Sequence, residues 1–349
     1  MFHINYPFCG LGLVTIILFV RLDRVDELSL ARKLKQYDWS GACLFIGGMT
    51  SFLVGISWGG VQHPWKSGAT LVPIILGFAA VIVFGWWQHL VRPYSLLPMS
   101  IFANWSIIAA FWCALVNGLV TFTILYYTPL YQMSVHGKSS IDAGKDILPA
   151  ICLMVPGSIV VSILSSHLRR FRWAIWGGCA LTTLACGLLI LFDVDTKNAM
   201  FYGIMAILGV GLGMVLTSVN ISIQAISEPE NCAMAASMYG FFRSLGMALG
   251  VAISGTVFQN TLYDHLSGLQ LPTLIAHDAE KFVFVLRSMA ESPMKTAILE
   301  SYMEGFDSVF TTVTGVAASA FIASVFIRNS DMDKVLMTPF SARRRSCGD

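Results

Sequence analysis

The sequence feature that most constrains the fold is a series of long, uncharged apolar runs. A helix needs about 20 residues to cross the roughly 30 Å hydrocarbon core of a bilayer. Nine segments have about this length, and Arg243 is the only Asp, Glu, Lys or Arg well inside one of them. We place them at residues 5–20, 40–60, 69–90, 105–130, 147–166, 173–192, 199–225, 234–258 and 307–327. The sequence therefore predicts an all-α membrane protein whose principal partner is the lipid bilayer.

Composition excludes several other classes of protein. Hydrophobic residues make up 56% of the 349-residue chain and charged residues 12%, about half the charged fraction of a typical soluble domain. The net charge is +2 and the basic residues form short clusters between apolar runs, so we predict no nucleic-acid partner. The eight cysteines include no C-x-x-C pair, which argues against a metal site. No catalytic motif is present, so we expect neither an enzyme nor a cofactor.

The loops between the predicted spans differ in positive charge. Fourteen Lys and Arg residues fall on one side, at residues 21–35, 92, 169–172 and 328–345, and seven on the other. Since cytoplasmic loops carry the excess of positive charge, we expect a cytoplasmic C-terminus and an external N-terminus. Residues 21–38 are then a cytoplasmic linker and 329–349 a cytoplasmic tail. Residues 259–304, interrupted by Pro272 and Pro293, form an external loop with short interfacial helices.

Polar side chains lie on one face of two predicted helices. In 199–225, spacings of three and four residues align Gly213, Thr217, Asn220 and Gln224. In 105–130, Asn117 and Thr121 share a face. Such a stripe lines a substrate cavity, or its amides bond across to a neighbouring helix, and both uses are common in membranes.

The predicted helix 234–258 carries Arg243. A cation at this position faces protein or a cavity and calls for a carboxylate partner, unless it snorkels to the headgroups. No acidic residue lies well inside a span. Close helix packing is expected at the glycines of this helix and of 199–225, in particular Gly209, Gly213, Gly246 and Gly250.

Several segments resemble one transporter family. The runs RFRWAIWGGCALTTLACGLLILFDVDT from Arg170, GVGLGMVLTSVNISIQ from Gly209 and YGFFRSLGMALGVAISGTVFQN from Tyr239 are similar to fungal drug:proton antiporters with fourteen spans, a branch of the major facilitator superfamily. The segment SFLVGISWGG with the following HPW adds to the resemblance. It implies the sixth to fourteenth helices of that fold, with the first five missing.

The resemblance assigns a place to each part of the chain. Residues 1–20 become the last helix of the N-terminal half, 39–92 two extra central helices, and 93–328 the six-helix C-terminal half. The cytoplasmic loop motif corresponds to SILSSHLRRFR, which contains Arg169, Arg170 and Arg172. Ser162 and Arg169 occupy positions where family members usually have glycine.

The resemblance also implies an activity: proton-coupled efflux of hydrophobic small molecules or secondary metabolites across the plasma membrane by alternating access. The proton gradient is the driving force. The residues expected to line the cavity are Asn117, Thr121, Thr217, Asn220, Gln224 and Arg243. A second polypeptide that supplies the missing half is a further expected partner. The alternative is a truncated, non-transporting membrane protein or a regulatory partner of an intact transporter.

Overall fold

A computed structural model describes residues 3, 5–19, 37–60, 62–90, 102, 104–194, 196–228, 231–290 and 292–328, with His277 described by its backbone only. Every regular element in these ranges is a helix, which confirms the predicted all-α fold. Apart from Tyr37 and Asp38, the predicted linker 21–38 lies outside the described residues, as does the predicted tail 329–349. The helices are α1 (Asn5–Phe19), α3 (Trp39–Trp58), α4 (Gly68–Leu90), α5 (Trp105–Ser134), α6 (Ser140–Asp146), α7 (Leu148–Leu168), α8 (Arg172–Leu189), α9 (Asn198–Ile226), α10 (Cys232–Gly268), α11 (Leu274–His277), α12 (Ala279–Ser288) and α13 (Pro293–Val325).

Seven helical segments of the described chain are long and apolar enough to cross a membrane. They are α3, α4, α5, α6 together with α7, α9, α10 and α13. The shorter apolar helix α1 has 15 residues, and α8 has 18. The count of nine spans therefore stays a prediction.

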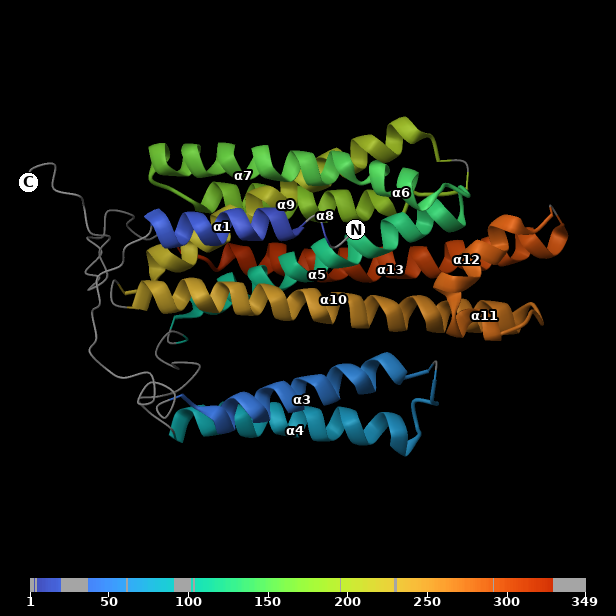
Figure 1. The fold of residues 1–349 in the computed structure, drawn as a ribbon, viewed down its shortest axis with the longest axis horizontal. Coiled ribbons are helices and arrows are strands. Elements are labelled where there is room, and N and C mark those ends of the chain that lie inside the picture. The colour runs from blue at the N-terminus through green and yellow to red at the C-terminus, as the bar shows by residue number, and fades with distance from the viewer. Residues whose placement is uncertain are drawn as a thin grey trace, which may run out of the picture.

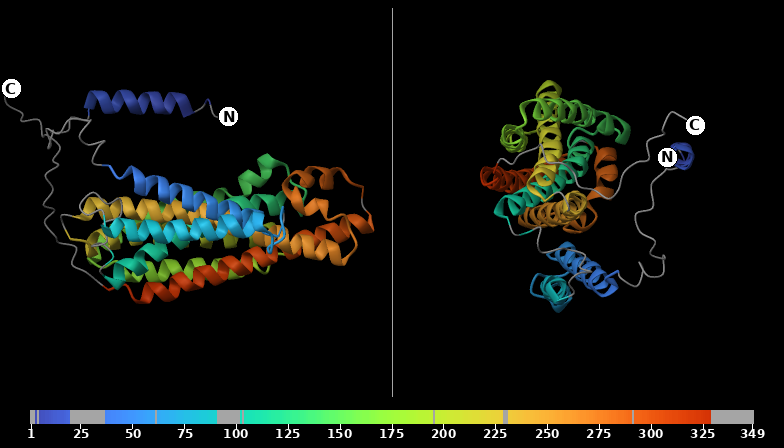
Figure 2. Two further views of the ribbon diagram at one scale, coloured as in Figure 1. Left: turned by 90° about the horizontal axis from the view of Figure 1, so that it is seen from below. Right: turned by 90° about the vertical axis from the view of Figure 1, so that its left-hand side faces the viewer.

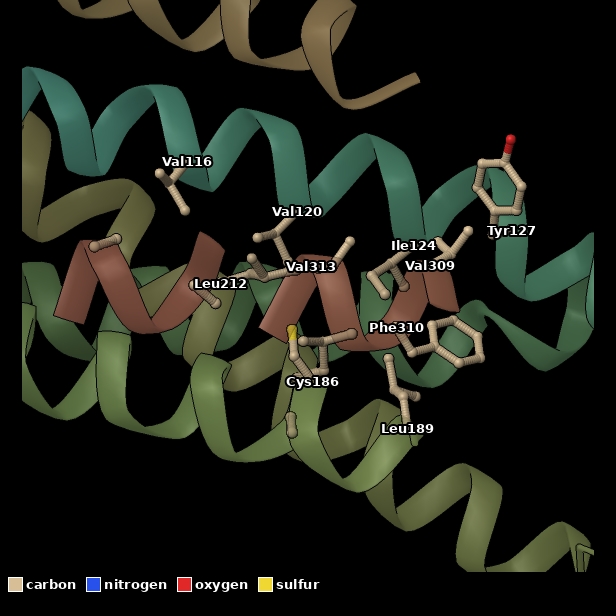
Figure 3. Packing of buried hydrophobic residues seen from close by; sticks show 14 of the residues in the cluster. Val116, Val120, Ile124, Tyr127, Cys186, Leu189, Leu212, Val309, Phe310 and Val313 are labelled. Atoms are coloured by element: carbon tan, nitrogen blue, oxygen red, sulfur yellow. The ribbon is translucent and has the colours of Figure 1, made fainter. Parts of the chain in front are cut away.

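Helix α5 occupies the centre of the bundle and is the most buried of the seven segments. It packs against α9, α10 and α13, as Figures 1 and 2 show. Figure 3 shows Val120 and Ile124 of α5 beside Val313 and Val309 of α13, and Leu189 of α8 near Phe310. Because lipid tails are as apolar as these side chains, dense packing rather than exclusion of water stabilises such a core.

Helices α3 and α4 form a separate pair beside α10 (Figures 1 and 2). Small residues allow the two helices to come close, because a Cβ added at Gly77 would lie 2.6 Å from the carbonyl oxygen of Gly48. The Asp38 side chain caps α3 by accepting a hydrogen bond from the Gly41 amide. Helix α1 has no buried residue in the described structure.

The structure corrects the prediction for residues 259–304. Helix α10 continues to Gly268 and α13 already begins at Pro293. Pro293 does not interrupt a helix as predicted, because it stands in the first turn of α13 behind the N-cap Ser292, where proline is tolerated. We call residues 259–304, with α11 and α12 between the two helix ends, the helical cap.

The helical cap has a packed core of its own. Leu262 and Leu266 of α10 are fully buried, as are Ile298 and Tyr302 of α13. The Tyr302 hydroxyl donates a 2.7 Å hydrogen bond to the carbonyl of Ala279 at the start of α12. These apolar contacts extend both helices beyond the predicted span ends.

Candidate substrate-lining face

The six predicted cavity residues lie on α5, α9 and α10, three helices that contact one another. Asn117 is buried, with 4% of its surface exposed. Its Nδ2 atom donates a 3.3 Å hydrogen bond to the carbonyl of Leu212 on α9. Thr121, one turn further along α5, donates to the carbonyl of Asn117 itself. The Asn117 amide thus joins α5 to α9.

The polar residues of α9 have a different environment. Thr217, Asn220 and Gln224 are all half-buried. The Gln224 amide donates a 2.8 Å hydrogen bond to Oδ1 of Asn220 along the same helix. Among the described residues, the Cys232 thiol of α10 approaches Gln224 Oε1 to 4.0 Å, as a weak hydrogen-bond donor. These side chains therefore form a half-open polar strip, which we call the α9 strip.

Arg243 lies on α10 one turn beyond Tyr239, and residues four apart share a helix face. The Tyr239 hydroxyl donates a 2.9 Å hydrogen bond to the carbonyl of Leu216 on α9, so this face of α10 is directed toward α9. Arg243 is half-buried, and its buried Nε has no hydrogen-bond partner among the described residues. No ion pair joins it to a described carboxylate. It is a cation available to a partner or ligand.

The depth of Arg243 bears on the snorkelling alternative. It stands eleven residues after the first residue of α10, about 16 Å along the helix axis. That distance is roughly half the thickness of the hydrocarbon core. Its carbonyl oxygen would lie 2.1 Å from a Cβ added at Gly118, so its backbone is held tightly against α5.

The four predicted packing glycines all lie at close helix crossings. A Cβ added at Gly246 would stand 1.9 Å from the carbonyl oxygen of Leu115 on α5, and one at Gly250 would stand 2.6 Å from that of Leu119. The glycines of α9 approach α7 in the same way: a Cβ added at Gly209 would stand 2.2 Å from the carbonyl oxygen of Ala150, and one at Gly213 would stand 2.2 Å from that of Met154. These separations leave no room for a side chain.

The loop motif shows why glycine suits one of its positions. Arg169 ends α7 in the left-handed conformation, with φ of 51°, which glycine adopts without steric cost. Arg172 opens α8 and its guanidinium lies 4.5 Å from the ring centroid of Trp176. The carbonyl of Arg170 accepts a 2.9 Å hydrogen bond from the Trp173 indole. The three arginines of the predicted motif therefore do not share one role.

Charged residues gather where the helices extend beyond the predicted spans. Glu300 and Glu304 belong to the long helix α13 rather than to a separate interfacial helix, because α13 starts earlier than the predicted span 307–327. At the same end of the bundle, Asp146 of α6 forms a 2.7 Å ion pair with Lys138 and accepts a 2.7 Å hydrogen bond from the Tyr202 hydroxyl. The N-cap signal Ser292-Pro293 could have indicated the true start of α13.

The profile of the Major Facilitator Superfamily matches residues 2–251 of this sequence. The chain belongs to the Major Facilitator Superfamily. Among curated proteins it is similar to MFS transporter L2 of Phoma sp., with 35% identity over 352 residues that cover 99% of this chain and 58% of the relative. Efflux pump FUS6 of Gibberella fujikuroi is 28% identical over 98% of this chain and 63% of its own length. The chain thus spans about three fifths of these relatives.

Solved structures agree on the fold. The chain aligns with a bacterial homologue of the human lysosomal transporter Spinster, in its inward-facing and occupied conformation, with a TM-score of 0.55. The alignment covers 84% of this chain and 66% of that structure at 17% identity. This likeness shows the fold, so the chain has the helical architecture of the superfamily to which it belongs.

Proposed function

We propose that this superfamily chain forms part of a transporter that exports hydrophobic small molecules, including secondary metabolites, in exchange for protons. Alternating access about a site near the bilayer midplane would carry the substrate. The helices α5 to α13 would contribute one half of the cavity. A complementary set of helices, on a longer chain or on a second polypeptide, would contribute the other half.

The observation that carries the proposal is the unpaired Arg243 of α10, a helix that packs against α9 with its half-open α9 strip. Intramembrane cations are rare and mark substrate or proton pathways. Asn220 and Gln224 offer amide groups, which orient many different ligands by hydrogen bonding. Apolar surroundings with few polar groups suit hydrophobic substrates.

Proton coupling follows as a hypothesis from the state of Arg243. Within the described residues no carboxylate is paired with it. A carboxylate of the complementary half would fill this role, and protonation of that carboxylate would release the pair. Exchange between the paired and released states is a means of linking proton flow to conformational change.

The test measures export under a pH gradient. The chain is co-expressed with the N-terminal helices of the Phoma relative, and efflux of a hydrophobic fluorescent compound is followed in membrane vesicles. Breaking a buried charge pair costs roughly 3–5 kcal/mol, so Arg243→Ala should reduce coupled export by more than about 100-fold. Arg243→Lys should keep part of it.

Ser244→Ala provides the matched control, because Ser244 is the next residue of α10 and is exposed. It should leave export unchanged. Equal export by the Arg243→Ala variant, at equal amounts of protein in the membrane, would rule out the proposed role of this cation.

A further inference from the structure

A cavity of about 990 Å³ lies outside the substrate-lining face, between the α3–α4 connection and the outer part of α10. Its walls come from residues 56, 60 and 62–65 on one side and from α10 residues between 253 and 264 on the other. Figure 2 shows the connection beside α10 at the end of the bundle that carries the helical cap. The SWGG and HPW segments, which the substrate-lining face does not use, build this cavity.

The connection is a compact turn that glycine makes possible. Gly60 has a φ of +81°, and its amide donates a 2.9 Å hydrogen bond to the carbonyl of His63. The ring of Trp65 folds back over Gly59, where an added Cβ would lie 2.5 Å from the ring. The indole therefore occupies the space that a side chain at position 59 would need.

Two side chains of α10 fix this turn in place. Thr256 donates a 2.9 Å hydrogen bond to the carbonyl of Ile56 at the end of α3. The Asn260 amide donates a 3.2 Å bond to the carbonyl of Gly59, and its Oδ1 stands 1.9 Å from the place of a Cβ at Gly60. The two walls of the cavity are thus joined by hydrogen bonds, so the site is built before a ligand arrives.

The lining combines one carboxylate with several aromatic rings. Asp264 is exposed and forms no ion pair with another described residue. Trp65, Tyr263 and His63 line the same cavity, whereas the neighbouring Lys66 does not. A carboxylate attracts a cation, and aromatic faces bind ammonium groups through their quadrupoles.

We propose that this cavity binds an organic ammonium group, with Asp264 as counter-ion and Trp65 and Tyr263 as aromatic walls. The cavity stands where α3 ends and α4 begins, which is the level of the lipid headgroups for a membrane-crossing pair. A choline headgroup and a free organic cation share this chemistry. The proposal is independent of the transport cycle.

The test measures binding of tetrapropylammonium by isothermal titration calorimetry. The full chain is placed in nanodiscs of phosphatidylglycerol, which contain no choline. We expect saturable binding that Asp264→Asn weakens by at least about tenfold and Trp65→Leu weakens similarly. Asp264→Glu, which keeps the charge, should retain most of the affinity. Binding of equal strength by Asp264→Asn, or no binding by the unaltered chain, would overturn the proposal.

Glu304→Gln is the matched control, because Glu304 is another exposed carboxylate of the helical cap and lies outside the cavity lining. It should bind as the unaltered chain does, and an equal loss there would overturn the proposal by showing general attraction to negative charge. Nanodiscs of phosphatidylcholine distinguish the two sources: weaker binding of the probe assigns the site to the lipid headgroup, and unchanged binding assigns it to a free cation.

Discussion

The side-chain amide of Gln88, near the end of α4, donates a 2.7 Å hydrogen bond to the buried carboxylate of Asp38 at the start of α3. The Trp87 indole donates to the same carboxylate at 3.1 Å, and the Gly41 amide does so at 2.8 Å. One acidic side chain thus caps α3 and joins it to α4. These contacts join the start of α3 to the end of α4, at the end of the hairpin opposite its connecting turn.

Removing the Gln88 amide should destabilise this pair. Leaving a buried acceptor without its donor costs about 1–3 kcal/mol, so Gln88→Ala should lower the free energy of unfolding by that amount. Denaturant unfolding in nanodiscs measures the change. Gln62→Ala, at an exposed glutamine, is the control and should have little effect. Equal stabilities of the two variants would contradict the role of this bond.

The same carboxylate should make stability depend on pH. Burial alone would raise the pKa of Asp38, but the hydrogen bonds from Gly41, Trp87 and Gln88 outweigh it and hold the pKa below its ordinary value. The stabilisation is therefore complete above the unfolded pKa, near 3.9, and is lost as pH falls through the lower, folded pKa. The stability difference between the unaltered chain and Asp38→Asn should shrink on acidification below about pH 4. A difference that grows on acidification would contradict this assignment.

Two glycines of α10 offer a test of helix packing. Gly246→Ala would push a methyl group into the carbonyl of Leu115, whereas a Cβ at Gly240 meets no atom within 4 Å. Overpacking costs about 1–3 kcal/mol, so Gly246→Ala should unfold at a lower temperature. Gly240→Ala should be neutral or slightly stabilising, because alanine favours helix. Thermal unfolding in detergent measures the melting temperatures of the two variants. Equal melting temperatures would contradict the close crossing of α10 and α5 at Gly246.

The charged residues of α6 allow a buried and an exposed ion pair to be compared. The Asp146 side chain is 7% exposed and is paired with Lys138, while the Asp142 side chain is 53% exposed and is paired with Lys145. Asp146→Asn should cost about 1–3 kcal/mol of stability, since Lys138 and Tyr202 both lose a charged acceptor. Asp142→Asn should change stability little, because exposed pairs contribute little. Denaturant titrations measure both stability changes. A larger loss for Asp142→Asn than for Asp146→Asn would show that burial does not determine how much each ion pair stabilises the protein.

Membrane orientation is a further prediction. With the eight native cysteines replaced by serine, Ile141→Cys and Arg170→Cys place single thiols at opposite ends of α6 and α7. A membrane-impermeant maleimide added to intact cells should label Ile141→Cys and leave Arg170→Cys unlabelled until the membrane is permeabilised. The opposite pattern would invert the orientation expected from the positive residues.

Apolar runs were sufficient to predict where most helices lie, because each helix must satisfy its own backbone in lipid. The predicted run 69–90 and α4 differ by one residue at the start. The same reasoning missed the outer parts of α10 and α13, which are polar on one side and are stabilised by each other. Leu262 and Tyr302 are buried by contacts between segments far apart in sequence, and such pairing is absent from a hydropathy pattern.

Periodicity identified the polar faces but left open what lies opposite them. Asn117 and Asn220 both lie on predicted polar faces, yet one amide is buried in an interhelical bond and the other lies on the half-open α9 strip. For the same reason, the sequence pattern does not predict the cavity around Asp264. This cavity forms where the turn between α3 and α4 contacts α10, and that contact depends on tertiary packing.

The length of α10 has a mechanical consequence. One uninterrupted helix of 37 residues is roughly 55 Å long and exceeds the hydrocarbon thickness by about 25 Å. Because Leu266 and Tyr302 are buried in the core of the helical cap, that part follows the tilt of α10 as a rigid body. If α10 tilts by a few degrees within the bilayer, its outer end is displaced by several ångströms. A spectroscopic probe at that tip would report the angle of a helix that contributes Arg243 to the interior.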